Sequence, residues 1–349
     1  MEKKNIMFLI GNGFDIGALS ALGAPHLTTY SQFYKYLSFY CLNSNNEIYK
    51  ALFESKTVVR DFWGKDFEEI LYEIFRNKAA TASVNHPDID ATTLQADYEE
   101  IQTLFLNFVN TVVLPEHLMT IYGKGINEIK SYLKDFPKYS KKNININDVD
   151  FAYNIFNFNY TTLVDNYFIN DNSIDVNNLS IIHPHGTYYV PKSILFGVTD
   201  AEKGHPENYP GGGNHQRQRK RERNITKVVE TIDKSIHYKN CEEIIKTTNT
   251  FVIFGHSIGN SDKWWWEKIA EQVNNGSDLL LYWFDNDISN QSDKEKELKK
   301  LFFENLSDYK ELSDEDKDIF YNGIEICFFN EKNPLDNLFN FKDIKLLNK

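Results

Sequence analysis

Two histidines, His183 and His185, stand two places apart in the stretch IIHPHGTYY at residues 181–189. If this stretch is a strand, both side chains lie on one face, because strand side chains alternate with a period of two. Histidine is the side chain best suited to proton transfer at neutral pH, and the glycine after His185 lets a ligand come close. We expect either a pair of hydrogen-bonded core histidines or a strand that ends in a cleft where His185 transfers a proton.

A glycine motif, LIGNGFDIG, follows the first apolar run and contains Gly11, Gly13 and Gly17. Glycines directly after a buried strand let the backbone turn tightly and approach a phosphate, whose charge meets the amides of the following helix. The spacing is one residue longer than the dinucleotide fingerprint, and no acidic residue marks the end of a second strand about 20 residues later. The motif fits a nucleotide-binding loop, and the alternative is a plain tight turn.

A third motif, FNFNYTTLVDN, places Asn159 and Thr161 just after an apolar run. A side-chain amide both donates and accepts hydrogen bonds, so Asn159 is suited to holding a ribose hydroxyl or a water. The alternative is that both side chains satisfy backbone groups at a strand-to-helix junction, as Asn and Thr commonly do.

A fourth motif, FVIFGHSIGNSD, contains GHSIG, which has the form of a nucleophile elbow around Ser257. That fold places its histidine after the serine, and none of the nine histidines of this chain follows Ser257. Gly255, Ser257 and Asp262 fit better as ligand-binding residues at the carboxyl end of a strand. The alternative is capping, in which Ser261 or Asp262 begins the helix DKWWWEKIAEQV.

The segments that carry these motifs alternate between strand and helix patterns, which predicts an α/β fold with a mostly parallel sheet. Helical spacing dominates a region that we expect to be a helical insertion at about 31–135, and a Gly- and Pro-rich stretch predicts a long loop at about 201–224. We expect one domain over residues 1–349. The predicted strands are residues 5–11, 151–162, 179–186, 193–197, 250–257, 278–285 and 324–330.

Composition limits the partners and the compartment. The net charge of −12 gives no general attraction to nucleic acid or anionic lipid. A local exception is the basic run from Arg217 to Arg223 in the long loop, which would grip phosphates or simply be solvated. The three cysteines show no paired spacing, so we expect neither disulfides nor a structural zinc site, and we expect a reducing compartment. No apolar run approaches ~18 residues, so we expect a cytoplasmic protein.

The motifs LIGNGFD, FNFNYTTLVDN, HPHGT and IFGHSIGNSD occur in this order, followed by the strand LLLYWF. Together they resemble the bacteriophage abortive infection AbiH-like family, which is similar to the sirtuin-like group of Rossmann-type NAD-binding domains. The resemblance implies a Rossmann-like, sirtuin-like sheet, with NAD as the substrate and no metal. It also implies that Gly11, Asn12 and Gly13 face the phosphates, with Asp15 near the ribose.

The resemblance further implies that His185 is the catalytic histidine and that Asn159 positions ribose or water. Gly255, Ser257 and Asp262 would line the adenosine side. Thr161 stands in the cofactor site where sirtuin-like enzymes usually have an acidic residue, which weakens the expectation of catalysis.

The implied function is an anti-phage effector that cleaves NAD to nicotinamide and ADP-ribose. We expect it to act as a homo-oligomer and to respond to a phage-derived trigger. Two alternatives stay open: a catalytically silent module that senses NAD or ADP-ribose, and a nucleic-acid-directed effector, such as a nuclease, that uses the basic loop. The last lacks a visible cluster of metal-binding carboxylates.

Overall fold

The computed structural model of the chain describes residues 3–40, 45–54, 67, 71, 91–121, 150–169, 178–190, 193–194, 196, 234–259, 262–306, 312–330, 338–339 and 341. The expected long loop at about 201–224 and its basic run at 217–223 lie outside these residues. The alternative of a nucleic-acid-directed effector that uses this loop therefore stays a prediction.

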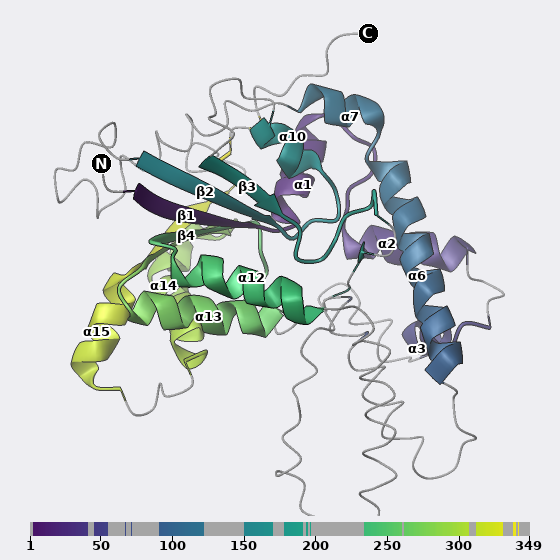
Figure 1. Cartoon of the computed structure of the whole chain (residues 1–349). Helices are drawn as coiled ribbons and strands as arrows, with labels where there is room; N and C mark the ends of the chain where they lie inside the picture. The colour runs from purple at the N-terminus through teal and green to yellow at the C-terminus, as the bar shows by residue number, and fades with distance from the viewer. Residues whose placement is uncertain are drawn as a thin grey trace, which may run out of the picture.

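A six-stranded sheet, parallel throughout, forms the centre of the fold (Figure 1). Its strand order, β3-β2-β1-β4-β5-β6, is the Rossmann order. From β1 the chain builds the sheet first to one side and then, starting with β4, to the other, so β1 and β4 flank the switch point. The inner strand β4 is buried at every position, because both faces of the sheet are covered. The predicted Rossmann-like α/β class is confirmed. The strands are β1 (Lys3–Ile10), β2 (Asp150–Asn157), β3 (Leu179–Ile182), β4 (Thr250–Phe254), β5 (Asp278–Phe284) and β6 (Ile324–Phe329).

Helices cover both faces of this sheet and form two separate hydrophobic cores. One core contains side chains of α1 and α10, and the other contains side chains of α12, α13, α14 and α15. Figure 1 shows α2 and α6 beyond the carboxyl ends of β1 and β2. The helices are α1 (Gly13–Ala21), α2 (Tyr30–Tyr40), α3 (Glu47–Glu54), α6 (Ala91–Val112), α7 (Pro115–Thr120), α10 (Leu163–Ile169), α12 (Lys234–Lys246), α13 (Lys263–Asn274), α14 (Gln291–Glu304) and α15 (Asp314–Asn322).

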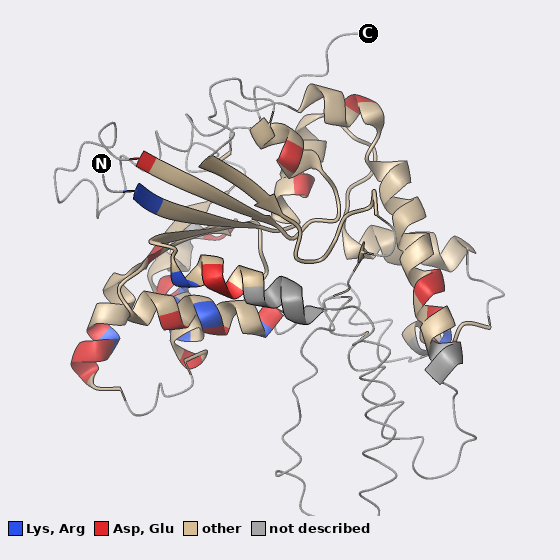
Figure 2. Cartoon of the chain, viewed as in Figure 1, with Lys and Arg blue, Asp and Glu red and all other residues tan. Residues whose placement is uncertain are grey.

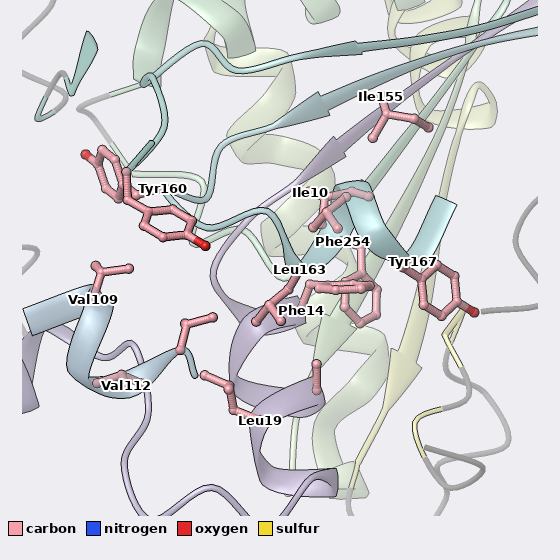
Figure 3. Close-up of a cluster of buried hydrophobic side chains, with 14 of the residues drawn as sticks. Ile10, Phe14, Leu19, Val109, Val112, Ile155, Tyr160, Leu163, Tyr167 and Phe254 are labelled. Atoms are coloured by element: carbon pink, nitrogen blue, oxygen red, sulfur yellow. The ribbon is translucent and has the colours of Figure 1, made fainter. Parts of the chain in front are cut away.

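Apolar side chains fasten α6 to the sheet near these carboxyl ends. Figure 3 shows Val109 and Val112 of α6 on the side of α6 that is turned to Leu19 of α1 and Leu163 of α10. All four are buried in the core that contains α1 and α10. Helix α6 thus packs against the helices that follow β1 and β2. Among the described helices, none has the length and apolar character that a membrane span requires.

One predicted strand, at 193–197, is wrong for the residues that the structure describes there. Ile194 and Phe196 are fully buried but belong to no strand. Gln102 of α6 donates a hydrogen bond to the Ile194 carbonyl oxygen at 2.6 Å, and the Phe196 amide donates to the Tyr98 hydroxyl at 3.3 Å. The segment is apolar because it packs under α6, whose side chains satisfy its backbone.

Candidate functional site

The turns after β1 and β4 meet at the point where the strand order reverses, which is where open α/β sheets bind their ligands. Gly11 donates to the Phe254 carbonyl and Gly13 to the Gly255 carbonyl, both at 2.9 Å. A Cβ atom on Gly11 or on Gly13 would lie 2.6 Å from the backbone of Gly255. The predicted residues Gly11, Gly13 and Gly255 therefore lie together, and their small size is needed for contact between the two turns.

His185 forms a buried pair with Asp262 at the same edge of the sheet. Its Nε2 lies 3.0 Å from Asp262 Oδ1, and both side chains are almost completely buried. Asp262 holds the N-cap position of α13 but makes no capping hydrogen bond. The alternative in which Asp262 caps this helix is therefore wrong, because its carboxylate turns to His185 instead. Ser261, the other candidate cap, lies outside the described residues. A carboxylate on one imidazole nitrogen orients the ring and stabilises the imidazolium that proton transfer creates.

A second histidine, His256, faces the other oxygen of the same carboxylate. Its Nε2 lies 3.9 Å from Asp262 Oδ2. Burial lowers the pKa of His256 to about 4, although the Asp262 charge opposes this. Burial alone would raise the pKa of Asp262, but the charge and hydrogen bond of His185, together with His256, hold it below its ordinary value. At neutral pH the structure thus contains an ionised Asp262 beside a neutral His256.

Aromatic rings fix both histidines in place. Phe158, from the turn after β2, packs edge-to-face on His185 with ring centroids 5.2 Å apart and on His256 at 4.7 Å. It also contacts Trp265 of α13 at 5.1 Å. Edge-to-face packing favours one relative orientation of each ring pair. The imidazoles are therefore held in position before any ligand arrives, as proton transfer requires.

A polar network joins the segments that follow β1, β2 and β3, on the face of the sheet that α1 and α10 cover. Thr161 Oγ1 donates to Asp15 Oδ2 at 2.6 Å. Asn157 Nδ2 donates to the Thr161 carbonyl at 3.0 Å and to Asp165 Oδ2 at 2.8 Å. His183 Nε2 lies 2.8 Å from Asp165 Oδ1. Thr161 is thus a partner of the buried Asp15, and an acidic residue in its place would repel that carboxylate.

The two histidines of HPH do not share a face, contrary to the expectation for a strand. His183 pairs with Asp165 of α10, whereas His185 pairs with Asp262, which precedes α13. These helices belong to the cores on opposite faces of the sheet. The reason is that β3 ends at Ile182, before either histidine, so the strand period no longer applies.

Three buried polar atoms in or next to this network have no hydrogen-bond partner among the described residues: Asp15 Oδ1, Asn159 Nδ2 and His183 Nδ1. Asp15 is 1% exposed and Asn159 is 4% exposed. Burial raises the pKa of Asp15 to about 7, the Thr161 hydrogen bond opposes this, and the nearby Asp165 adds to it. Orphaned buried polar groups are rare in proteins, and a missing ligand is one explanation for them.

The remaining predicted site residues have other surroundings. Asn12 is bound to Thr28, accepting from its hydroxyl at 2.6 Å and donating to its carbonyl at 3.0 Å. Ser257 is exposed on the turn after β4. Sequence reasoning missed His256 and Phe158, although both stand inside quoted motifs. Their only signal was adjacency to Ser257 and Asn159.

The described residues contain no group of three His, Cys, Asp or Glu side chains placed to hold a metal ion. Comparisons with curated proteins and with solved structures found no match. The family model described as "Bacteriophage abortive infection AbiH" matches residues 7–284. This range includes both turns at the switch point, the His185–Asp262 pair and the network around Asp15. The chain therefore belongs to the bacteriophage abortive infection AbiH family.

Proposed function

We propose that this protein is an abortive-infection effector that hydrolyses NAD to nicotinamide and ADP-ribose in the cytoplasm. Membership of the AbiH family supports the role in abortive infection. The observation that carries the chemistry is the buried His185–Asp262 pair, at the switch point of a Rossmann-like sheet. Asn159, in the turn after the neighbouring strand β2, has a buried side-chain nitrogen, Nδ2, without a hydrogen-bond partner among the described residues.

The reaction requires a bound ribose, a positioned water and a proton acceptor. Cleavage of the glycosidic bond to nicotinamide passes through an oxocarbenium-like state. The water oxygen bonds to the anomeric carbon, and nicotinamide leaves with the electron pair of the broken bond. The neutral form of His185 takes the proton of the water, Asp262 stabilises the imidazolium that forms, and the proton then passes to solvent. Asn159 holds the ribose or the water.

The test is nicotinamide release from NAD by the purified full chain, alone and with lysate of phage-infected cells as a source of trigger. We expect His185→Ala to lower the rate about 100-fold or more, the usual scale for a lost proton acceptor. Asn159→Ala should also lower the rate, because the ribose or the water then lacks the side chain that holds it. The control is His26→Ala, because His26 is exposed. Release that persists in His185→Ala, with folding intact, would refute the assignment.

A second candidate is a sensor that binds NAD or ADP-ribose without cleaving it. The observation that favours it is Thr161, whose hydroxyl is engaged by Asp15 at 2.6 Å. The turn after β2 thus offers no carboxylate of its own next to Asn159. Tight binding of NAD in calorimetry, with no nicotinamide released even with infected lysate, would select this candidate.

A further inference from the structure

The pair formed by His185 and Asp262 is buried, with His185 3% exposed and Asp262 5% exposed. A histidine that takes a proton in one turnover has to lose it before the next. Because neither member of the pair has much contact with water, the proton needs a route from the pair to the surface.

His256 lies on the far side of the Asp262 carboxylate from His185. Its Nε2 is 3.9 Å from Asp262 Oδ2, and this nitrogen is buried without a hydrogen-bond partner among the described residues. The side chain of His256 is 7% exposed, and because Nε2 is buried, the exposed part lies elsewhere on that side chain. The next residue, Ser257, is exposed. His185, Asp262 and His256 thus form a row that leads from the buried pair towards the surface.

The ring of His256 lies among aromatic side chains that would accept a phenylalanine equally well. It packs edge-to-face on Phe158 at 4.7 Å and on Trp266 at 4.9 Å between ring centroids. A phenylalanine would avoid the cost of burying ring nitrogens. Burial lowers the pKa of His256 to about 4, against the Asp262 charge and together with that of His185. The ring is therefore neutral at neutral pH, and a neutral imidazole has a nitrogen that accepts a proton.

The lysines of α13 do not compete with the two imidazoles for Asp262. Lys263 lies 3.7 Å from Glu267. Lys268 lies 2.9 Å from Glu271. Figure 2 shows these basic and acidic residues together along α13. In the described part of the chain, the ion pairs of Asp262 are those with the two histidines.

We propose that His256 relays the proton of the reaction from the His185–Asp262 pair to water. This inference rests on the proposed function, since it supplies the exit for the proton that the reaction releases. The His185 imidazolium gives its Nε2 proton to Asp262 Oδ1, and the carboxyl group turns and passes this proton to His256 Nε2. His256 then releases a proton to water from its other ring nitrogen. One proton enters at His185 and one leaves at His256, so both rings are neutral again.

The relay requires His256 Nε2 and Asp262 Oδ2 to approach each other. Their distance of 3.9 Å has to shorten by about 1 Å to reach hydrogen-bond length. Hydrogen bonds that carry catalytic protons are often long before the ligand binds and shorten in the complex.

The first test measures proton exchange in the full chain without a ligand. Ionised Asp262 only accepts, so His185 Nε2 carries the proton between them. NMR of protein with 15N-labelled histidine rings follows this proton, and its signal is the one absent from His185→Gln. We expect its exchange with water to slow about tenfold or more in both His256→Phe and His256→Gln, because neither side chain passes a proton on.

The glutamine variant separates a relay from a merely positioning role, because its amide keeps an N–H group that can face Asp262. Exchange as fast as in wild type in His256→Gln would overturn the inference, whether or not His256→Phe is slow or folds. Slow exchange in His256→Gln supports it. His26→Gln is the matched control, because His26 is exposed and its loss should leave the exchange of the His185 proton unchanged.

A second arm uses nicotinamide release from NAD by the wild-type chain and by His256→Gln. We expect His256→Gln to lower kcat about tenfold or more and to leave KM within about twofold, because the proton leaves after substrate has bound. A kcat equal to that of wild type would overturn the inference. Slow exchange in His256→Gln without nicotinamide release by the wild-type chain refutes the hydrolase alone, since the exchange test does not depend on turnover.

Discussion

Two buried groups, Asp15 and His256, respond to pH in opposite directions. Burial raises the pKa of Asp15 from 3.8 to about 7 and lowers that of His256 from 6.5 to about 4. Between the two Asp15 values the folded state binds more protons than the unfolded state, so this contribution to stability is lost as pH rises through about 7. For His256 the unfolded state binds more protons than the folded state between pH 4 and 6.5. The contribution of neutral His256 to stability is therefore lost as pH falls from 6.5 towards 4.

We predict that Asp15→Asn stabilises the protein at pH 8 relative to wild type, and does so much less at pH 5. The reason is that the asparagine side chain carries no charge at either pH, whereas Asp15 must ionise in its buried site above about pH 7, which costs free energy of desolvation. The limit set by the pKa change is roughly 4 kcal/mol. Urea denaturation at both pH values measures the difference, with Asp293→Asn as control, because Asp293 is exposed on α14. A difference that does not change with pH would contradict the pKa argument.

At the scale of elements, the turn after β3 decides what each histidine contacts. Gly186 has a φ of +79° and donates its amide to the His183 carbonyl at 3.1 Å. A Cβ atom at this position would lie 1.9 Å from the Ser193 carbonyl oxygen. Only glycine combines this backbone conformation with such a close approach. The turn separates His183 from His185 and brings each to its own carboxylate.

We predict that Gly186→Ala destabilises the protein far more than Gly23→Ala. Both glycines have positive φ, but a Cβ on Gly23 would meet nothing within 4 Å. Gly23→Ala should therefore cost about 1 kcal/mol for the strained backbone alone. Gly186→Ala should cost at least about 3 kcal/mol, since a backbone clash adds to that strain. Denaturant unfolding of the two variants compares them directly, and equal costs would show that the turn yields to the added methyl group.

Much of this architecture is predictable from sequence, because buried strands appear as continuous apolar runs. Of these runs, β1 and β4 are followed directly by a glycine. The runs that became β1, β4 and β5 are matched to within a few residues, and the motifs follow these runs at one edge of the sheet. The partner of His185 is not predictable in this way. An acidic residue before a helix usually caps it, whereas Asp262 pairs with His185, a residue 77 positions away in the sequence. Contacts across distant segments leave no local signal.

At the scale of the whole molecule, the part of the chain beyond the family match supports the site. The match ends at residue 284, but β6 completes the sheet, and Phe339 lies in the core of α1 and α10. The Phe339 ring centroid is 4.9 Å from that of Phe14 on α1 and 5.3 Å from that of Tyr167 on α10. These helices carry Asp15 and Asp165, so Phe339 supports the polar network from behind.

We predict that Phe339→Ala lowers the free energy of unfolding by about 3 to 5 kcal/mol, the usual cost of removing a buried ring. The cavity would open between α1, α10 and Phe254 of β4, whose ring lies 4.8 Å from that of Phe339. Phe284→Ala serves as control, because Phe284 is 50% exposed and should cost much less. NAD affinity, measured where both variants are folded, should fall only for Phe339→Ala, since only that cavity loosens the helix that positions Asp15. Unchanged affinity in a destabilised Phe339→Ala would show that the turn after β1 holds Asp15 without help from the carboxyl-terminal segment.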